Sequence, residues 1–281
     1  MTGPAGRRLA LLTALAMLAF AGNSLLCRMA LRDGAMDAAS FTALRLAFGA
    51  LALGLLAGRG HAGGSGRWSG AFFLFLYAAA FSFAYRSLDA GAGALVLFGA
   101  VQGCMAVAGW LGGERLRPRE TAGLLMALGG LVYLLLPGAT APPLGAALLM
   151  GAAGVAWGLY SLAGRGQGDP LAATAGNFRL SLAFLPLLVL PGWGDWRVSV
   201  EGVVYAALSG ALTSGLGYAL WYAALRGLGA FQAAGVQLSV PVLAALLGAL
   251  LLAEPLTTRL VLASAAVLGG IALMLRARAP R

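Results

Sequence analysis

The chain has 281 residues, of which 60% are hydrophobic and only 10% are charged. A soluble domain carries about 25% charged residues, so these few charges cannot cover the surface of a water-soluble protein of this length. The formal net charge of +10 would suggest nucleic-acid binding in a soluble protein. In so apolar a chain, the positive charge is instead expected in loops at the membrane surface. We therefore expect no nucleic-acid partner.

The apolar residues form ten long runs, and a bilayer core of about 30 Å takes roughly 20 residues of helix. The runs are near twice the length of a barrel strand and do not alternate polar with apolar residues. Because backbone groups in the bilayer must form hydrogen bonds within their own segment, these runs are expected to be helices. The first run is longer than expected for a cleaved signal peptide. The sequence predicts an all-α membrane protein with ten transmembrane helices, at about 9–31, 40–57, 68–87, 90–112, 119–136, 144–164, 171–190, 202–224, 230–252 and 258–275.

The basic residues are all arginines, and their distribution predicts the orientation in the membrane. Twelve lie in the termini or in loops on the N-terminal side: Arg7, Arg8, Arg59, Arg67, Arg115, Arg117, Arg119, Arg165, Arg226, Arg276, Arg278 and Arg281. Five lie on the opposite side: Arg28, Arg32, Arg86, Arg197 and Arg259. By the positive-inside rule, both termini are expected in the cytoplasm of a cell whose inner membrane holds the protein.

The two halves of the chain are weakly similar. When residues 86–136 are shifted by 140, they align with 226–276 without a gap, and thirteen of the 51 positions are identical. Earlier in each half, Arg45-Leu46 corresponds to Arg179-Leu180. Each half holds five helices, an odd number, so the second enters the membrane from the opposite side. We therefore predict two inverted five-helix repeats, 1–139 and 140–281, with a substrate site between them near the midplane.

Several of these segments resemble those of a known family. They are GGERLRPRETAGLLMALGGLVYLLL at 112–136, LLAEPLTTRLVLASAAVLGGIALML at 251–275, SVPVLAALLG at 239–248 and the two Arg-Leu pairs. In their order and spacing the chain resembles the drug/metabolite transporter superfamily, in its ten-helix EamA-type branch. The resemblance implies ten helices around a central cavity, lined mostly by helices one, three, four, six, eight and nine. One departure is Val101, where family members often have a proline matching Pro241.

Charged residues within the spans are costly and need an explanation. Arg45 and Arg179 are open to two interpretations, either an anion contact in the cavity or a structural role at a helix end with the side chain reaching the headgroups. Their recurrence in both halves favours the structural role. Glu114 and Glu254 are expected to cap the following helix or to pair with an arginine close in sequence, Arg117, Arg119 or Arg259. All nine acidic residues fall in loops or at helix ends, which disfavours efflux of cationic drugs.

Polar and aromatic residues at midplane depth are the candidates for substrate binding. An amide in hydrocarbon needs a hydrogen-bond partner or water, so it is expected to face the interior. The alternative is contact between helices, worth about 0.6 kcal/mol per hydrogen bond. Aromatic rings at this depth could form the wall of a pocket for an amphipathic solute. The predicted substrate-binding residues are Asn23, Gln102, Trp157, Tyr160, Trp221, Tyr222 and Gln237.

These features predict a secondary transporter that exports small polar or zwitterionic metabolites, such as amino acids, by alternating access. Glycine-rich corners at 90–93 and 214–217 are the predicted hinges. A carrier of nucleotide-like or sugar-phosphate-like anions and a non-transporting scaffold or sensor remain alternatives. The spans hold no paired catalytic groups, and no Cys/His cluster indicates a metal, so we expect neither an enzyme nor a cofactor. The expected partners are a small-molecule substrate and the lipid bilayer, with monomer and homodimer both open.

Overall fold

The computed structural model describes residues 4–57, 66–113, 117–138, 140–164, 169–189, 196–228 and 235–278, and the named secondary-structure elements in these ranges are all helices. Each of the ten apolar runs predicted from the sequence forms helix within the described residues. The first half contains α1 (Pro4–Leu31), α2 (Ala38–Ala57), α3 (Trp68–Ala84), α4 (Ala90–Leu111) and α5 (Pro118–Leu135).

The second half contains two composite spans. The seventh is built from α7 (Pro170–Ser181), a 3-10 turn η2 (Leu182–Phe184) and α8 (Leu185–Val189). The eighth is built from α9 (Val200–Ala207), a π-helix η4 (Leu208–Leu216) and α10 (Gly217–Leu225). The remaining spans are α6 (Leu144–Ala163), α12 (Ser239–Leu252) with the helical turn that precedes it from Gly235, and α13 (Thr258–Arg278).

Helix length and composition agree with a protein that crosses a membrane many times. Eight helices in the described part of the chain are long and apolar enough to span a bilayer. Helix α3 is also apolar but shorter, at 17 residues. Large apolar side chains such as Leu55, Leu250 and Leu148 are exposed on the outside of the bundle. In a membrane this surface faces lipid, so its exposure is favourable.

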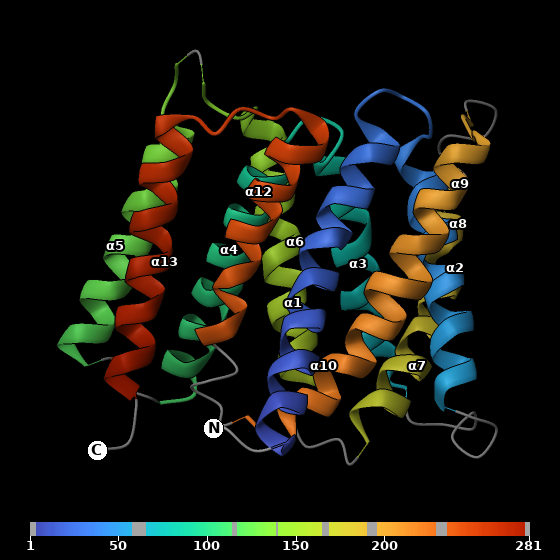
Figure 1. The fold of residues 1–281 in the computed structure, drawn as a ribbon, viewed down its shortest axis with the longest axis horizontal. Helices are drawn as coiled ribbons and strands as arrows, with labels where there is room; N and C mark the ends of the chain where they lie inside the picture. Colours follow the sequence, from blue (N-terminus) through green and yellow to red (C-terminus); the bar gives the residue numbers. More distant parts are fainter. Residues whose placement is uncertain are drawn as a thin grey trace.

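The helices form an elongated bundle in which the start of α1 and the end of α13 lie at the same end (Figure 1). Helices α5 and α13, which correspond in the predicted repeat, pack side by side at one edge of the view. Glycines allow this close approach, since a Cβ on Gly123 would lie 2.5 Å from the Gly270 carbonyl oxygen. A Cβ on Gly130 would meet the side chains of Ala266 and Val267 at 2.9 and 3.0 Å. Small residues at such positions bring helix backbones together in membranes.

A polar contact at the end of the bundle opposite to the termini ties the two halves together. Asp37 precedes α2 and accepts the backbone N–H of Ser40 at 2.8 Å, which is the geometry of a helix N-cap. It also accepts the N–H of Arg197 at 3.1 Å, while its own N–H donates to the Arg197 carbonyl. Burial raises the pKa of Asp37, but hydrogen bonds from Ser40, Arg197 and Ala39 outweigh it, so the pKa lies below its usual value.

Candidate functional site

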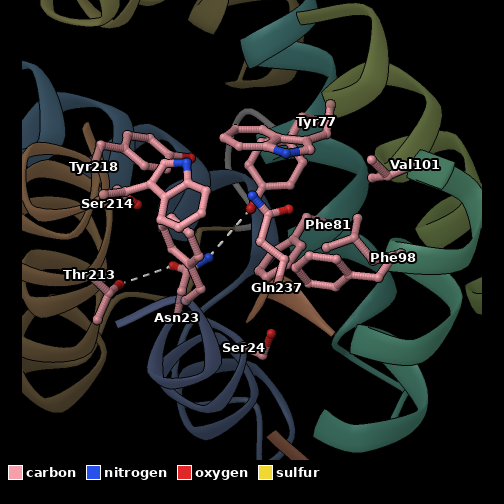
Figure 2. Close-up of a pocket in the computed structure, with 14 residues that line it drawn as sticks. Asn23, Ser24, Tyr77, Phe81, Phe98, Val101, Thr213, Ser214, Tyr218 and Gln237 are labelled. Atoms are coloured by element: carbon pink, nitrogen blue, oxygen red, sulfur yellow. Dashed lines mark hydrogen bonds between the residues drawn. The ribbon is translucent and has the colours of Figure 1, made fainter. Parts of the chain in front are cut away.

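A central cavity of about 590 Å³, including the part open to its surroundings, lies between the two halves (Figure 2). Its lining comes from spans one, three, four, six, eight and nine, the same six that the family resemblance implies. Both apolar and polar side chains contribute to the lining, as is usual for a small-molecule site. The lining residues are Phe20, Asn23, Ser24, Tyr77, Phe81, Leu97, Phe98, Val101, Trp157, Thr213, Ser214, Tyr218, Trp221 and Gln237.

Four of the seven residues predicted to bind substrate line this cavity: Asn23, Trp157, Trp221 and Gln237. The other three do not. Gln102 follows Val101 in α4 but is not part of the lining. Tyr160 and Tyr222 instead meet at Thr174 of α7, whose hydroxyl lies 3.3 Å from the Tyr160 hydroxyl and 2.8 Å from that of Tyr222. The structure therefore brings these two tyrosines together on one side of the cavity, around a shared hydroxyl.

Asn23 of α1 is the centre of a buried polar network on the cavity wall. Its Oδ1 accepts the Ser209 hydroxyl at 2.7 Å and faces that of Thr213 at 3.3 Å. Its Nδ2 lies 3.5 Å from the hydroxyl of Tyr77 (Figure 2). These contacts join α1 to α3 and to the π-helix, so Asn23 connects the two halves at the cavity.

The π-helix contributes polar side chains to the cavity and to the network around Asn23. Ser209, Thr213 and Ser214 all lie within η4, and the wider turn of a π-helix presents a different set of side chains than an α-helix would. Such segments are rare and are frequent at functional sites. The segment includes the start of the predicted hinge at 214–217, but sequence reasoning proposed glycine flexibility there and not a π-helix.

Aromatic rings form most of the remaining wall. The Trp157 ring lies 4.8 Å from Tyr77 and 5.5 Å from Tyr218, with which it is stacked. Phe20 meets Tyr218 and Trp221 edge-on at 5.8 and 6.0 Å. Sequence reasoning missed Tyr77 and Phe20. The signal for Tyr77 was present, because it lies four residues before Phe81 and therefore on the same face of α3.

Among the arginines that the structure describes, Arg45 alone is buried in the core, with 2% of its surface exposed. Its Nη2 donates to the Tyr77 hydroxyl at 3.3 Å, and its guanidinium lies 4.9 Å from the Phe81 ring centre. A side chain so placed does not reach the headgroups, so that part of the structural interpretation is wrong for Arg45. Its counterpart Arg179 is exposed. The two arginines match in sequence and differ in environment.

A charged cluster closes the bundle above the cavity, at the end opposite to the termini. Arg28, at the end of α1, pairs with Glu254 at 3.1 Å and with Asp89 at 3.5 Å. Its Nη1 also donates to the carbonyls of Tyr85 and Arg86. Ser24 and Phe81, one turn deeper on α1 and α3, already line the cavity. The cluster therefore lies about one helical turn from the cavity lining, toward this end of the bundle.

The partners of Glu254 correct a prediction made from the sequence. Glu254 was expected to cap the following helix or to pair with a nearby arginine, but it pairs with Arg28 and accepts the N–H of Ala90 at 2.8 Å. It thus caps α4 of the first half, while Thr257 caps α13. Burial raises the pKa of the Glu254 carboxyl, although Ala90 and Arg28 act in the opposite direction. Its repeat counterpart, Glu114, lies outside the described residues.

Comparison with known proteins agrees with this architecture. Residues 144–276, which run from α6 into α13, match the model of the EamA-like transporter family. An uncharacterized protein of Pseudomonas aeruginosa is 64% identical over 278 residues, covering 98% of this chain and 97% of that one. A solved crystal structure of a protein with 25% identity superposes with a TM-score of 0.65, covering 97% of this chain and 99% of its own.

The fold and the match define a multi-pass membrane protein of a transporter class. The chain belongs to the EamA-like transporter family, within the drug/metabolite transporter superfamily. Membership of this family indicates a membrane transporter of small molecules.

Proposed function

We propose that the protein is a secondary transporter of the bacterial inner membrane, with both termini cytoplasmic, that exports small polar or zwitterionic metabolites such as amino acids. The observation that carries the proposal is the cavity, to which both halves of the chain contribute, from Phe20 to Val101 and from Trp157 to Gln237. Alternating access requires such a site, which the two halves can open to one side and then to the other.

The chemistry of the lining supports a substrate with both polar and apolar parts. Amide and hydroxyl groups of Asn23, Gln237 and Ser214 provide donors and acceptors, and the aromatic rings provide an apolar wall. The Arg28 cluster closes one end, so its opening would expose the cavity to the side opposite to the termini. A small-molecule substrate and the bilayer are then the partners that this activity needs.

Counterflow in proteoliposomes tests the proposal. Vesicles that contain the purified protein are loaded with a mixture of unlabelled amino acids and related metabolites, and uptake of each labelled compound is measured. We expect accelerated exchange of at least one compound, reduced about tenfold or more in Trp157→Ala and Gln237→Ala. Trp110→Ala is the matched control, because Trp110 is 63% exposed on the outside of the bundle. A folded preparation that exchanges no compound would contradict the proposal.

A further inference from the structure

Arg45 is a buried cation whose hydrogen-bonding capacity is mostly unused. Its Nη2 contacts the Tyr77 hydroxyl, but within the described part of the chain neither Nε nor Nη1 has a hydrogen-bond partner. Ion pairs form around Arg28 and Arg32, but Arg45 has none with a described residue. Among the described residues, this fully buried guanidinium therefore has no counter-ion.

Such an arrangement is costly unless another group completes it. Removing an ion from water carries a large desolvation penalty, which is offset only by good pairing and hydrogen bonds. The rings of Tyr77 and Phe81, whose centres lie 5.3 and 4.9 Å from the guanidinium carbon, offset part of the charge. They leave two N–H-bearing atoms unpaired, so a role in binding an anion explains what packing alone does not.

The position of Tyr77 connects this charge to the cavity. Tyr77 lines the cavity, and its hydroxyl oxygen accepts from both Arg45 and Asn23. No described residue accepts the proton of that hydroxyl. Because the oxygen already faces two donors, its O–H is available to an acceptor in the cavity, and the adjacent cation strengthens it as a donor.

We propose that Arg45 is the counter-charge for a carboxylate on the transported solute, and that the Tyr77 hydroxyl makes the contact on the cavity side. The inference rests on the proposed transport function and names the substrate class for the same cavity: solutes with a free carboxylate and no net positive charge. Arg45 and Arg179 then differ in function although they match in the repeat, because only Arg45 adjoins the cavity wall.

A double-mutant cycle tests whether the charge of Arg45 can stabilise a carboxylate at the cavity wall, and it does not require the substrate to be known. Asn23→Asp places a carboxylate next to Tyr77, where Arg45 can compensate it. We expect Asn23→Asp to be tolerated in the wild-type background and to destabilise the Arg45→Met background strongly, with a coupling of about tenfold or more in the unfolding equilibrium. Arg179→Met, combined with Asn23→Asp, is the matched control and should show no coupling. Absence of coupling at Arg45 would overturn the proposal.

A binding measurement tests the substrate class directly. Matched pairs of free amino acids and their amides, with aliphatic and aromatic side chains, are titrated while tryptophan fluorescence reports on Trp157 and Trp221. We expect at least one acid to bind about tenfold or more tightly than its amide, and Arg45→Met and Tyr77→Phe to remove this preference while Arg179→Met keeps it. Equal binding of acids and amides, no response to any acid, or a preference retained in Arg45→Met would overturn the proposal.

The two experiments separate this inference from the transport function. Exchange in vesicles without a preference for carboxylates would leave transport standing and overturn the role of Arg45. Coupling and carboxylate binding without exchange in vesicles would support Arg45 as an anion site and count against transport.

Discussion

Arg28 and Glu254 lie 226 residues apart in the chain, and their side chains meet with Nε 3.1 Å from Oε1. The contact joins the end of α1 in the first half to the link between α12 and α13 in the second. Since Glu254 also accepts the N–H of Ala90 at the start of α4, one carboxylate joins three segments at this end of the bundle. A transporter that opens at this end has to break these contacts.

Replacement of Arg28 by methionine is expected to loosen this closure. Hydrogen bonds to charged groups contribute about 1.5–3 kcal/mol each, and Arg28 makes several, so opening should increase about tenfold or more. Cys27, fully buried beside Arg28, reports the change. In a Cys104→Ala background, the rate of maleimide labelling at Cys27 should rise by that factor in Arg28→Met.

Arg32→Met is the matched control for this experiment. Arg32 lies one turn further along at the same end and contacts Asp33 and the Leu252 carbonyl, but not Glu254. Its replacement should leave the Cys27 labelling rate within about twofold of the background. Equal labelling in the two variants would show that the Arg28 cluster does not close the cavity.

Asp37 is expected to make stability depend on pH in the acid range. Its pKa in the folded protein is below the ordinary value of 3.8, so folding favours the ionised form. Its contribution to stability is present above pH 3.8 and is lost as the pH falls through the folded pKa. Thermal unfolding in detergent, followed from about pH 6 to about pH 3, should show this loss in the wild type and a weaker one in Asp37→Asn.

The cap and cross-half contacts of Asp37 also matter at neutral pH. Loss of a helix N-cap costs about 0.5–2 kcal/mol, and we expect Asp37→Ala to fall in this range. Asp33→Asn, at an exposed carboxylate in the same connection, should change neither the stability nor its dependence on pH. A steep acid transition that persists in Asp37→Asn would assign it to another group.

The paired glycines of α5 give a test of helix packing with an internal control. A Cβ on Gly130 would lie 2.9 Å from Ala266 and 3.1 Å from the Ala263 carbonyl, whereas one on Gly129 would meet nothing within 4 Å. We expect Gly130→Ala to destabilise the protein by about 1–3 kcal/mol through overpacking. Gly129→Ala should stabilise it by up to about 1 kcal/mol, because alanine is the better helix former. Thermal unfolding of the two variants measures the difference, and equal effects would contradict the packing of α5 on α13.

The sequence predicted the helices well because a bilayer demands them. Apolar runs of sufficient length can satisfy their backbone only as helices, so even α3 and the composite seventh and eighth spans could be located. The π-helix could not be predicted, because nothing in LSGALTSGL distinguishes it from an α-helical segment. Within this segment Gly210 packs closely on α2, where a Cβ would clash with the Arg45 carbonyl oxygen, and such a tertiary contact cannot be read from the local sequence.

The candidate site was predicted less completely, because depth in the membrane does not determine which way a side chain points. Asn23 and Tyr160 were both predicted at midplane depth, yet one lines the cavity and the other bonds to Thr174. The repeat was a second source of error. It suggested equal roles for Arg45 and Arg179, whereas only Arg45 is buried. A repeat constrains the backbone of the two halves, and the side chains around each copy differ.

Tyr222 and Trp221 are neighbours in α10, and their replacement should separate binding from stability. Trp221 lines the cavity, while the Tyr222 hydroxyl lies 2.8 Å from that of Thr174. Hydrogen bonds between membrane helices are worth about 0.6 kcal/mol on average and up to about 1.7. We therefore expect Tyr222→Phe to lower stability by an amount in this range and to leave the affinity for a transported solute within about twofold. Trp221→Ala should reduce that affinity about tenfold, since it removes part of the cavity wall. Thr174→Val should lower stability at least as much as Tyr222→Phe, because it removes this hydrogen bond and the one with Tyr160. If Tyr222→Phe reduced affinity as much as Trp221→Ala, then the cavity would extend to Thr174 when solute is bound, and the Thr174 cluster would belong to the binding site.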